Sequence, residues 1–257
     1  MLRLPGAVKS RFSHVMPLPD MPTTAMVLAA GYGKRMRPVT DIIPKPMVEV
    51  AGRSLIHRVL DQLVVNGIRK AVVNLSYKGE QLREHLEGRN APELVFSIED
   101  TPLETGGGIA KALPLLGNEP FFVANSDVIF LDGTVPTLHR LAQHWDPARM
   151  DALLLLVPSV RAYGYHGQGD FFLNPKGVMR RRKEHEVAPF VFTGIQLMHP
   201  RLFKDAPSGA FSLNVLYNRN VVADGSIERI FGISHDGAWL HVGDPRSFAF
   251  AENYLRE

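Results

Sequence analysis

The distribution of apolar and polar residues along this chain predicts short strands separated by helices. In the first half, almost wholly apolar runs predict buried strands at residues 25–30, 71–75, 94–98 and 121–124. Between them, apolar residues recur at helical spacing over residues 53–66, 79–86 and 108–116. Ser54 is a candidate N-cap of the first of these helices, and Gly67 a candidate C-terminal stop.

This alternation predicts an α/β fold. Strands that alternate with helices form right-handed βαβ units, so we expect a Rossmann-like mixed, mostly parallel sheet with helices on both faces. Ligands of such sheets bind beyond the carboxyl ends of the strands. The loops that follow residues 30, 75, 98 and 124 are therefore the places to look for a site, and glycine and polar residues concentrate there.

The second half is less regular. The pattern predicts strands at residues 153–157, 190–198 and 237–242, a hairpin at 171–182, and helices at 213–223 and 245–255. We expect an N-terminal extension at residues 1–24, poorly ordered, and one domain at 25–257. Within that domain, the regular alternation ends near residue 130, which divides it into halves at residues 25–130 and 131–257.

Composition narrows the class of protein. The 257 residues carry a net charge of +3, which suits anionic substrates, and no nucleic-acid-binding motif is visible. The longest apolar stretch, Ala152–Val157, is far too short to span a membrane. There is no cysteine, so we expect a cytoplasmic protein without disulfides. We expect a monomer or a homodimer. Residues 1–24 lack the apolar core of a signal peptide, and a start at Met16 or Met21 is an alternative.

The segment LAAGYGKRMRPVT at residues 28–40, followed by PKP at 44–46, contains the first candidate chemistry. Gly31 and Gly33 directly follow a predicted strand, where backbone N–H groups can turn towards phosphate oxygens. Arg35 and Lys45 add positive charge for a triphosphate. The spacing fits neither a Walker loop nor a dinucleotide fingerprint, and a tight turn with solvated basic residues is the alternative.

Two further features follow later strands. Asp127 ends an apolar strand, where a carboxylate is either a Mg²⁺ ligand or the cap of a turn. The segment LETGGG at residues 103–108 places three glycines before the predicted helix. Such glycines allow close approach to a flat ligand, or form a flexible connector.

The segment at residues 28–40, together with PKP, resembles the signature of the sugar nucleotidyltransferases, also called nucleotidyl sugar pyrophosphorylases, and the resemblance covers most of residues 25–257. It implies that Arg35 contacts the triphosphate and that Lys45 bridges the α-phosphate and the sugar phosphate. It also implies that Asp127 binds Mg²⁺, although many relatives read Gly-Asp where this chain has Ser126-Asp127. The nucleotide-binding candidates are Ala30, Gly31, Gly33, Lys34, Asn74, Thr105, Gly106 and Gly107, with Glu99 near them.

Within the family, LETGGG most resembles the uridylyltransferases of cell-wall recycling that act on N-acetylmuramate 1-phosphate, and HGQGDF at residues 166–171 adds to this likeness. The resemblance implies UTP and N-acetylmuramate 1-phosphate as substrates. Guanylyl transfer to mannose 1-phosphate and thymidylyl transfer to glucose 1-phosphate are alternatives. The presence of Arg35, Lys45 and Asp127 together argues against a binding protein without turnover.

The resemblance also implies a nucleotide-binding half at residues 25–130 and a sugar-binding half at residues 131–257. The sugar-binding candidates are Asn125, Gly169, Asp170, Thr193 and Gly194. Phe192 replaces the asparagine of the N-T-G segment found in many relatives, which indicates either a different sugar substituent or plain core packing. The basic run at residues 180–183 is a solvated hairpin or a dock for a carboxylate of the sugar.

The expected metal site departs from the family near the C-terminus. Relatives read W-x-D-V-G where this chain reads WLHVG at residues 239–243, so His241 replaces a carboxylate. We expect Asp127 to be the only protein carboxylate on Mg²⁺, with His241 in indirect contact. Asp244 is the expected N-cap of the last helix. His139 and His144 have no third partner, so a solvated helix is favoured over zinc.

Overall fold

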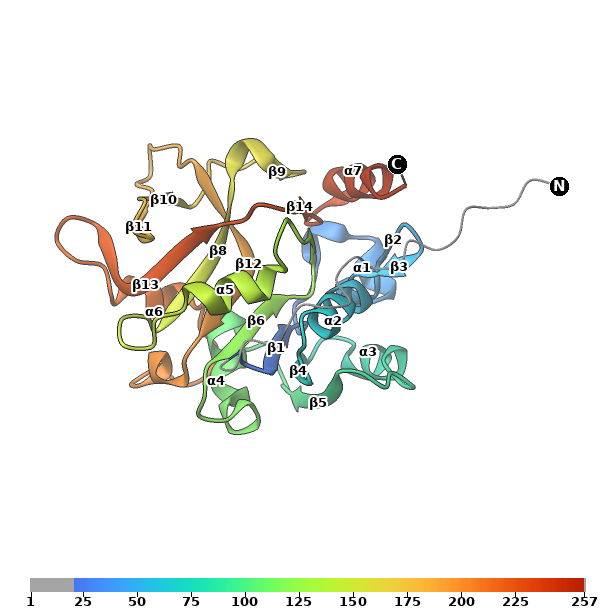
Figure 1. Cartoon of the computed structure of the whole chain (residues 1–257). Helices are drawn as coiled ribbons and strands as arrows, with labels where there is room; N and C mark the ends of the chain where they lie inside the picture. Colours follow the sequence, from blue (N-terminus) through green and yellow to red (C-terminus); the bar gives the residue numbers. More distant parts are fainter. Residues whose placement is uncertain (1–20, 257) are drawn as a thin grey trace.

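The computed structural model describes residues 21–256, so almost all of the predicted N-terminal extension lies outside the described residues. Its centre is a sheet of nine strands in the order β10-β11-β13-β8-β12-β6-β1-β4-β5 (Figure 1). The strands are β1 Thr24–Leu28, β4 Lys70–Leu75, β5 Glu93–Ile98, β6 Phe121–Asn125, β8 Ala152–Pro158, β10 Phe171–Leu173, β11 Val178–Arg181, β12 Phe190–Met198 and β13 Ser226–Ser234.

The sheet is mixed but mostly parallel, as predicted. Strands β6, β1, β4 and β5 are parallel neighbours, and so are β8 and β13. Within this sheet only β11 and β12 run against the others. The antiparallel pairing of β12 with β6 joins the two predicted halves into one continuous sheet.

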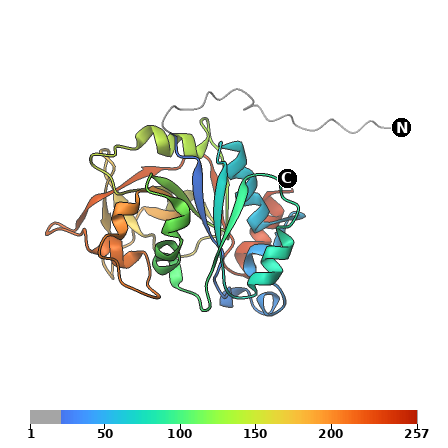
Figure 2. The same cartoon turned by 90° about the horizontal axis from the view of Figure 1, so that it is seen from below.

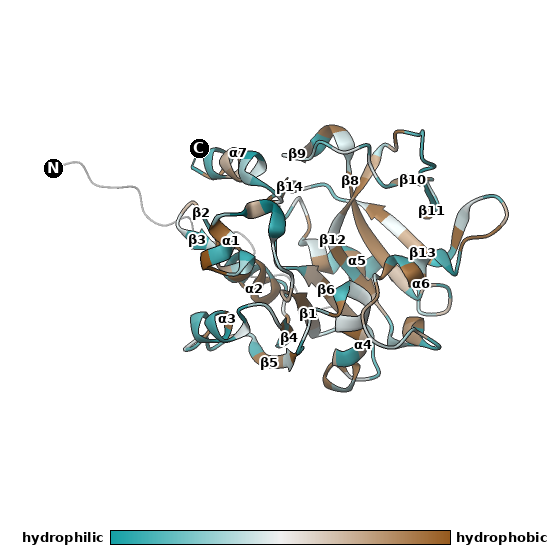
Figure 3. Ribbon diagram, turned by 180° about the vertical axis from the view of Figure 1, so that it is seen from behind, coloured by the Kyte–Doolittle hydropathy of each residue, from teal (hydrophilic) through white to brown (hydrophobic). Residues whose placement is uncertain are grey.

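Helices cover both faces of the sheet because successive strand residues point to opposite sides. Ala25 and Val27 of β1 pack on the side of α2, α3 and α5, whereas Met26 between them packs on the side of α4 and α6. Figure 2 shows the two layers, and Figure 3 shows apolar residues concentrated in the strands between them. The helices are α1 Val39–Ile42, α2 Leu55–Val65, α3 Gly79–His85, α4 Glu104–Leu116, α5 Thr137–His144, α6 Asn214–Asn218 and α7 Pro245–Tyr254.

Two small sheets support the carboxyl ends of the central strands. One contains β7 Val128–Leu131, β14 Ala238–His241 and β9 Ala162–Tyr163, and the other contains β2 Glu49–Val50 and β3 Arg53–Ser54. A third apolar cluster forms beneath the first loop, where Met36, Leu55 and Val242 pack together. This cluster fixes the loop after β1 against the C-terminal part of the chain.

The predicted elements agree with the structure over most of the first half and less well in the second. The hairpin β10–β11 and the strand β12 are confirmed. The strands β7 and β13 were not predicted, and α6 is shorter than the helix expected at residues 213–223. No helix among residues 21–256 has both the length and the apolar character needed to cross a membrane.

Candidate active site

A pocket of about 340 Å³ lies at the carboxyl ends of β1, β4, β5 and β6, where the topology predicts a ligand site. Its wall consists of the segments after these strands and the start of α4. The predicted site residues in the wall are Ala30, Gly31, Gly33, Lys34, Arg35, Lys45, Asn74, Thr105, Asn125 and Asp127.

Gly33 holds the turn after β1 in a left-handed conformation, with φ of +62°. A Cβ at this position would lie 2.9 Å from the Thr40 side-chain methyl and 3.0 Å from Lys45 Cβ. Thr40 Oγ1 donates a 3.0 Å hydrogen bond to the Gly33 carbonyl. Buried Met36 anchors the short 3-10 helix Lys34–Met36 that follows. The turn is therefore packed tightly over the segment that carries Lys45.

Gly31 has a different environment, because a Cβ there would meet no protein atom within 4 Å. Protein packing gives no reason for glycine at this position, whereas close approach of a ligand to the backbone would. Lys34 and Arg35 are exposed in the same wall. Within the described chain Arg35 forms no ion pair, so its charge is available to an anionic ligand.

An ion pair between Lys45 and Asp127 lies in the wall of the pocket. Lys45 Nζ donates to Asp127 Oδ2 at 2.7 Å. The lysine side chain is 9% exposed and the aspartate side chain 30%, so the carboxylate is the more accessible partner. Lys45 begins the 3-10 helix Lys45–Met47, and Asp127 lies between β6 and β7. A lysine and a carboxylate side by side are suited to a phosphate group and a divalent cation respectively.

A buried hydrogen-bond network supports the pocket from behind. Asn74 Oδ1 accepts from the Ala29 N–H at 2.7 Å, and Asn74 Nδ2 donates to Glu99 Oε1 at 2.7 Å. Glu99 Oε2 accepts from the Leu103 N–H at 2.8 Å. A Cβ at Gly108 would lie 2.8 Å from Glu99 Oε1, so this glycine leaves room for the network. Asn74 therefore ties the loop after β1 to β5 and to the start of α4.

His241 lies near the ion pair at the end of β14. Its ring stacks on Trp239 with centroids 5.9 Å apart and meets Tyr165 edge-on at 6.2 Å. Burial is the main cause that lowers the pKa of His241; the Asp127 carboxylate opposes this shift and Lys45 reinforces it. The imidazole is therefore neutral at neutral pH.

Comparison with known proteins agrees with this geometry. The family model for nucleotidyl transferase matches residues 24–172, which include the segment at residues 28–40 and PKP at 44–46. The chain belongs to the nucleotidyl transferase family. N-acetylmuramate alpha-1-phosphate uridylyltransferase of Caulobacter vibrioides is 44% identical over 241 residues, covering 92% of this chain and 98% of that protein.

Two more relatives extend the comparison. The protein of the same name from Neisseria meningitidis is 35% identical, covering 85% of this chain and 92% of its own length. The crystal structure of HddC from Yersinia pseudotuberculosis complexed with GMP-PN has a TM-score of 0.73 and covers 91% of this chain and 99% of that one. Its sequence identity is 21%, so this likeness shows the fold of the nucleotidyl transferase.

The glycines at residues 106–108 of this nucleotidyl transferase lie inside α4, so the prediction that the helix starts after them was wrong. The N–H groups of Gly106 and Gly107 both donate to the Phe211 carbonyl, at 2.8 and 3.1 Å. A Cβ on Gly106 would overlap the Phe211 ring. These two glycines make room for a neighbouring segment and do not line the pocket, whereas Thr105 does.

Among the sugar-binding candidates, Thr193 has a different environment from Gly194 and Asn125. Thr193 is fully buried, and its Oγ1 donates to the Leu155 carbonyl at 2.8 Å. It is a core residue, which corrects the expectation of a sugar contact. Gly194 has φ of +83°, and a Cβ there would lie 2.7 Å from Asn125 Nδ2. Gly194 thus supports Asn125, which lines the pocket.

Gly169 and Asp170 also serve the framework. Gly169 has φ of +74°, and a Cβ there would overlap the Ala188 carbonyl oxygen. Asp170 Oδ2 accepts from the Phe192 N–H at 2.8 Å. Neither residue lines the pocket. Glycine-rich sequence here reflects close packing of the hairpin against β12, which the pattern alone did not distinguish from ligand contact.

The remaining polar candidates have structural roles. Asp244 is the N-cap of α7 and forms a capping box with Ser247, as predicted. His139 is buried and only His144 is exposed, so the expectation of a solvated helix face is wrong for His139. Across residues 21–256 no three His, Cys, Asp or Glu side chains gather closely enough to hold a metal ion by themselves.

Some residues at the site were not assigned a role from sequence. Glu99 was named only as a neighbour, yet it is a buried carboxylate in the pocket wall. Ser126, where relatives have glycine, donates its hydroxyl to the Leu28 carbonyl at 2.7 Å and so locks the turn before Asp127 to the end of β1. Glu99 and Ser126 each directly follow a strand, and this position is the feature of the sequence that could have identified them as site residues.

Proposed function

We propose that this nucleotidyl transferase moves a uridylyl group from UTP to N-acetylmuramate 1-phosphate and releases pyrophosphate. The observation that supports it most directly is the ion pair of Lys45 and Asp127 in a pocket whose glycine loop carries Arg35, which has no ion-pair partner among residues 21–256. The choice of substrates rests on the 44% identity to the Caulobacter vibrioides uridylyltransferase over almost the whole length of both proteins. We further propose that the reaction belongs to cell-wall recycling, as the resemblance of the LETGGG segment at residues 103–108 implies.

The proposed chemistry is a single in-line displacement. An oxygen of the sugar phosphate attacks the α-phosphorus of the triphosphate, and pyrophosphate leaves from the opposite side. Lys45 binds the α-phosphate and the sugar phosphate, which reduces the repulsion between two anionic reactants. Arg35 binds the departing phosphates. Catalysis then consists of positioning and charge stabilisation, without a covalent enzyme intermediate.

Mg²⁺ fits the residues present. It prefers one or two carboxylates and completes its shell with phosphate oxygens and water. The pocket offers Asp127, whose side chain is more exposed than its lysine partner. We propose that Asp127 holds Mg²⁺ and that neutral His241 contacts it only indirectly. When bound, the ion would neutralise charge on the phosphates.

We propose that Glu99 takes part in base choice, because it lies in the pocket wall. Each of its oxygens already accepts one hydrogen bond, from Asn74 or from the Leu103 N–H, and a remaining lone pair matches the N3–H of uracil or thymine and equally the N1–H of guanine. Guanylyl or thymidylyl transfer to another sugar phosphate is therefore the alternative function.

The test is pyrophosphate release by the purified chain with UTP, GTP, ATP and dTTP, each combined with a panel of sugar 1-phosphates. We expect the highest kcat/KM with UTP and N-acetylmuramate 1-phosphate. A clear preference for GTP with mannose 1-phosphate would replace the proposed function by the guanylyl alternative. The Lys45→Ala variant is the negative control, because it retains the pocket but lacks the positive charge proposed to bind both the α-phosphate and the sugar phosphate.

A further inference from the structure

The basic run at residues 180–183 has one member that differs from its neighbours. Arg180 forms an ion pair with Glu186, with Nη1 2.7 Å from Oε2. Arg182 donates from Nε to the Gly169 carbonyl at 3.1 Å and from Nη1 to further backbone carbonyls. Among the described residues Arg181, Arg182 and Lys183 all lack an ion pair. Arg181 is the member of the run that has a buried side-chain nitrogen without a hydrogen-bond partner in the described chain.

Arg181 is half-buried and held in place by neutral groups. Its guanidinium lies between two aromatic rings, 5.1 Å from the Phe171 centroid and 5.9 Å from that of Tyr217. Nη2 donates to Asn214 Oδ1 at 2.6 Å, while buried Nε has no hydrogen-bond partner within the described chain. Burial lowers the pKa of Arg181, yet a guanidinium remains charged at neutral pH.

Asp170 is the carboxylate whose charge raises the pKa of Arg181, although the two residues form no ion pair. Burial still lowers this pKa, so the charge of Asp170 compensates the desolvation of the guanidinium only in part, and a ligand carboxylate would add opposite charge at closer range. A guanidinium forms charge-assisted hydrogen bonds to carboxylates. Nε of Arg181 is buried and Nη2 donates to Asn214, so Nη1 is the nitrogen left for a ligand.

Arg181 does not line the pocket itself, but two series of neighbouring residues connect it to residues of the pocket wall. Asn214, which accepts from Arg181, directly follows Leu213, whose N–H donates to Thr105 Oγ1 at 3.0 Å. Thr105 lines the pocket. The first series therefore reaches the pocket wall at the start of α4.

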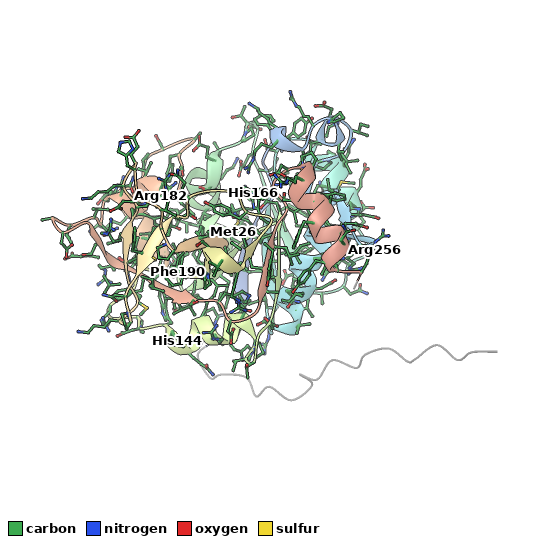
Figure 4. The ribbon with its side chains drawn as sticks, turned by 90° about the horizontal axis from the view of Figure 1, so that it is seen from above. Met26, His144, His166, Arg182, Phe190 and Arg256 are labelled. Atoms are coloured by element: carbon green, nitrogen blue, oxygen red, sulfur yellow. The ribbon has the colours of Figure 1, made fainter. Side chains whose placement is uncertain are left out.

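The second series runs across the strands. Arg181 is opposite Phe171 in the hairpin, and Phe171 is opposite Phe190 of β12. Four residues further along β12, Gly194 contacts Asn125 of the pocket wall. Figure 4 shows Phe190 and the neighbouring Arg182 in the same part of the molecule, away from Arg256 at the end of α7.

We propose that Arg181 binds a carboxylate carried by the sugar and so selects sugar phosphates that bear one. This inference rests on the proposed function, because N-acetylmuramate differs from N-acetylglucosamine by a lactyl ether that ends in a carboxylate. Arg181 is then the specificity-determining residue for this substituent, while Lys45 and Arg35 serve the phosphates common to all substrates.

The experiment compares N-acetylmuramate 1-phosphate with N-acetylglucosamine 1-phosphate in wild-type protein, Arg181→Gln and Arg181→Lys. In Arg181→Gln we expect kcat/KM for the muramate substrate to fall about 10- to 100-fold, mainly through KM, as for loss of a charge-assisted hydrogen bond. Turnover of the glucosamine substrate should change less than about twofold. Arg181→Lys should recover part of the loss, because it restores the charge without the planar geometry.

Arg180→Gln is the matched control, since Arg180 belongs to the same run but is already paired with Glu186. It should leave both substrates unaffected. Equal losses on both sugars in Arg181→Gln would show a merely structural role and overturn the inference. Calorimetric binding of the two sugar phosphates gives a second readout that does not require turnover. Equal affinity of wild-type protein for both sugar phosphates would also overturn the inference. If the protein binds the muramate substrate more tightly than the glucosamine substrate but turns it over with no nucleotide, only the proposed function is contradicted.

Discussion

The two halves of the sheet use glycine and polar residues in opposite ways. In the half at residues 25–130, which we propose binds the nucleotide, Gly31 faces open space, and Arg35 has no ion-pair partner within the described chain. In the half at residues 131–257, which we propose binds the sugar, Gly169 and Asp170 are packed against neighbouring backbone or hydrogen-bonded to it. The same residue types therefore indicate a ligand in one region and close packing in the other. A group that has no protein partner indicates a ligand, whereas a group whose contacts are all made within the protein indicates close packing.

The largest effect should come from the ion pair. Lys45→Ala and Asp127→Asn should each lower turnover about a hundredfold or more, because each removes a preorganised charge from the phosphate site. Arg35→Ala should have an effect of similar size. Steady-state pyrophosphate release by the purified variants measures this, with circular dichroism as the check on folding. Near-normal turnover in any of the three would place the chemistry elsewhere.

The two loop glycines should respond differently to alanine. Gly31→Ala should reduce turnover about tenfold or more, because the added methyl would lie where we propose the ligand approaches the backbone. Stability should change by less than about 0.5 kcal/mol, since this Cβ would meet no protein atom within 4 Å. Gly33→Ala should cost about 1–3 kcal/mol of stability, because φ of +62° and the nearby Thr40 methyl both oppose a side chain. Urea denaturation and turnover measured on the same samples test the contrast, and identical behaviour of the two variants would remove it.

Substitution of a core residue in the proposed sugar-binding half should affect the stability of the protein rather than the KM for the sugar phosphate. Thr193→Val removes the hydroxyl that donates to Leu155 and should cost about 1–3 kcal/mol. The KM for the sugar phosphate should stay within about twofold of wild type, since no lost contact reaches the ligand. Asn125→Ala is the comparison, because Asn125 lines the pocket and its loss should raise KM. A raised KM in Thr193→Val would restore the sugar contact expected from sequence.

The cap of α7 should give a smaller change. Asp244→Ala removes the acceptor for the Ser247 N–H and should cost about 1 kcal/mol of stability. The metal concentration that supports half-maximal turnover should be unchanged. If that concentration rises markedly, Asp244 belongs to the metal site instead of the helix.

The smallest effect concerns acid stability. Burial is the main cause that lowers the pKa of His235, so the unfolded chain binds a proton more readily than the folded one. The free energy of unfolding should therefore decrease as pH falls below about 6.5 and level off below the folded-state pKa. His235→Gln should reduce this decrease without abolishing it, since His57 and His241 are shifted in the same direction. Urea denaturation at pH 8 and pH 5 measures the slope, and an unchanged slope would exclude His235.

Sequence alone predicted the nucleotide-binding half well because its strands are short apolar runs bounded by clear turns. It missed β13, where polar Glu228 and Arg229 interrupt the apolar pattern, and Arg229 has φ of +60°. It placed the start of α4 too late because glycine disfavours helices, whereas hydrogen bonds to the Phe211 carbonyl stabilise that first turn. Residue type and position therefore located the pocket, but tertiary contacts decided which candidates face it.

The pairing of β12 with β6 has a mechanical consequence. Residues Ile195 to Met198 are in register with Ala124 to Phe121, so the floor beneath both substrates is one hydrogen-bonded surface. Hinge closure needs a few residues that absorb large backbone rotations between two bodies, and a continuous ladder at the boundary resists such rotation. Entry and exit of ligands must then depend on movements of the surface loops above a stiff floor. We therefore expect the distance between the proposed sites for nucleotide and sugar to be set when the chain folds, not when the substrates arrive.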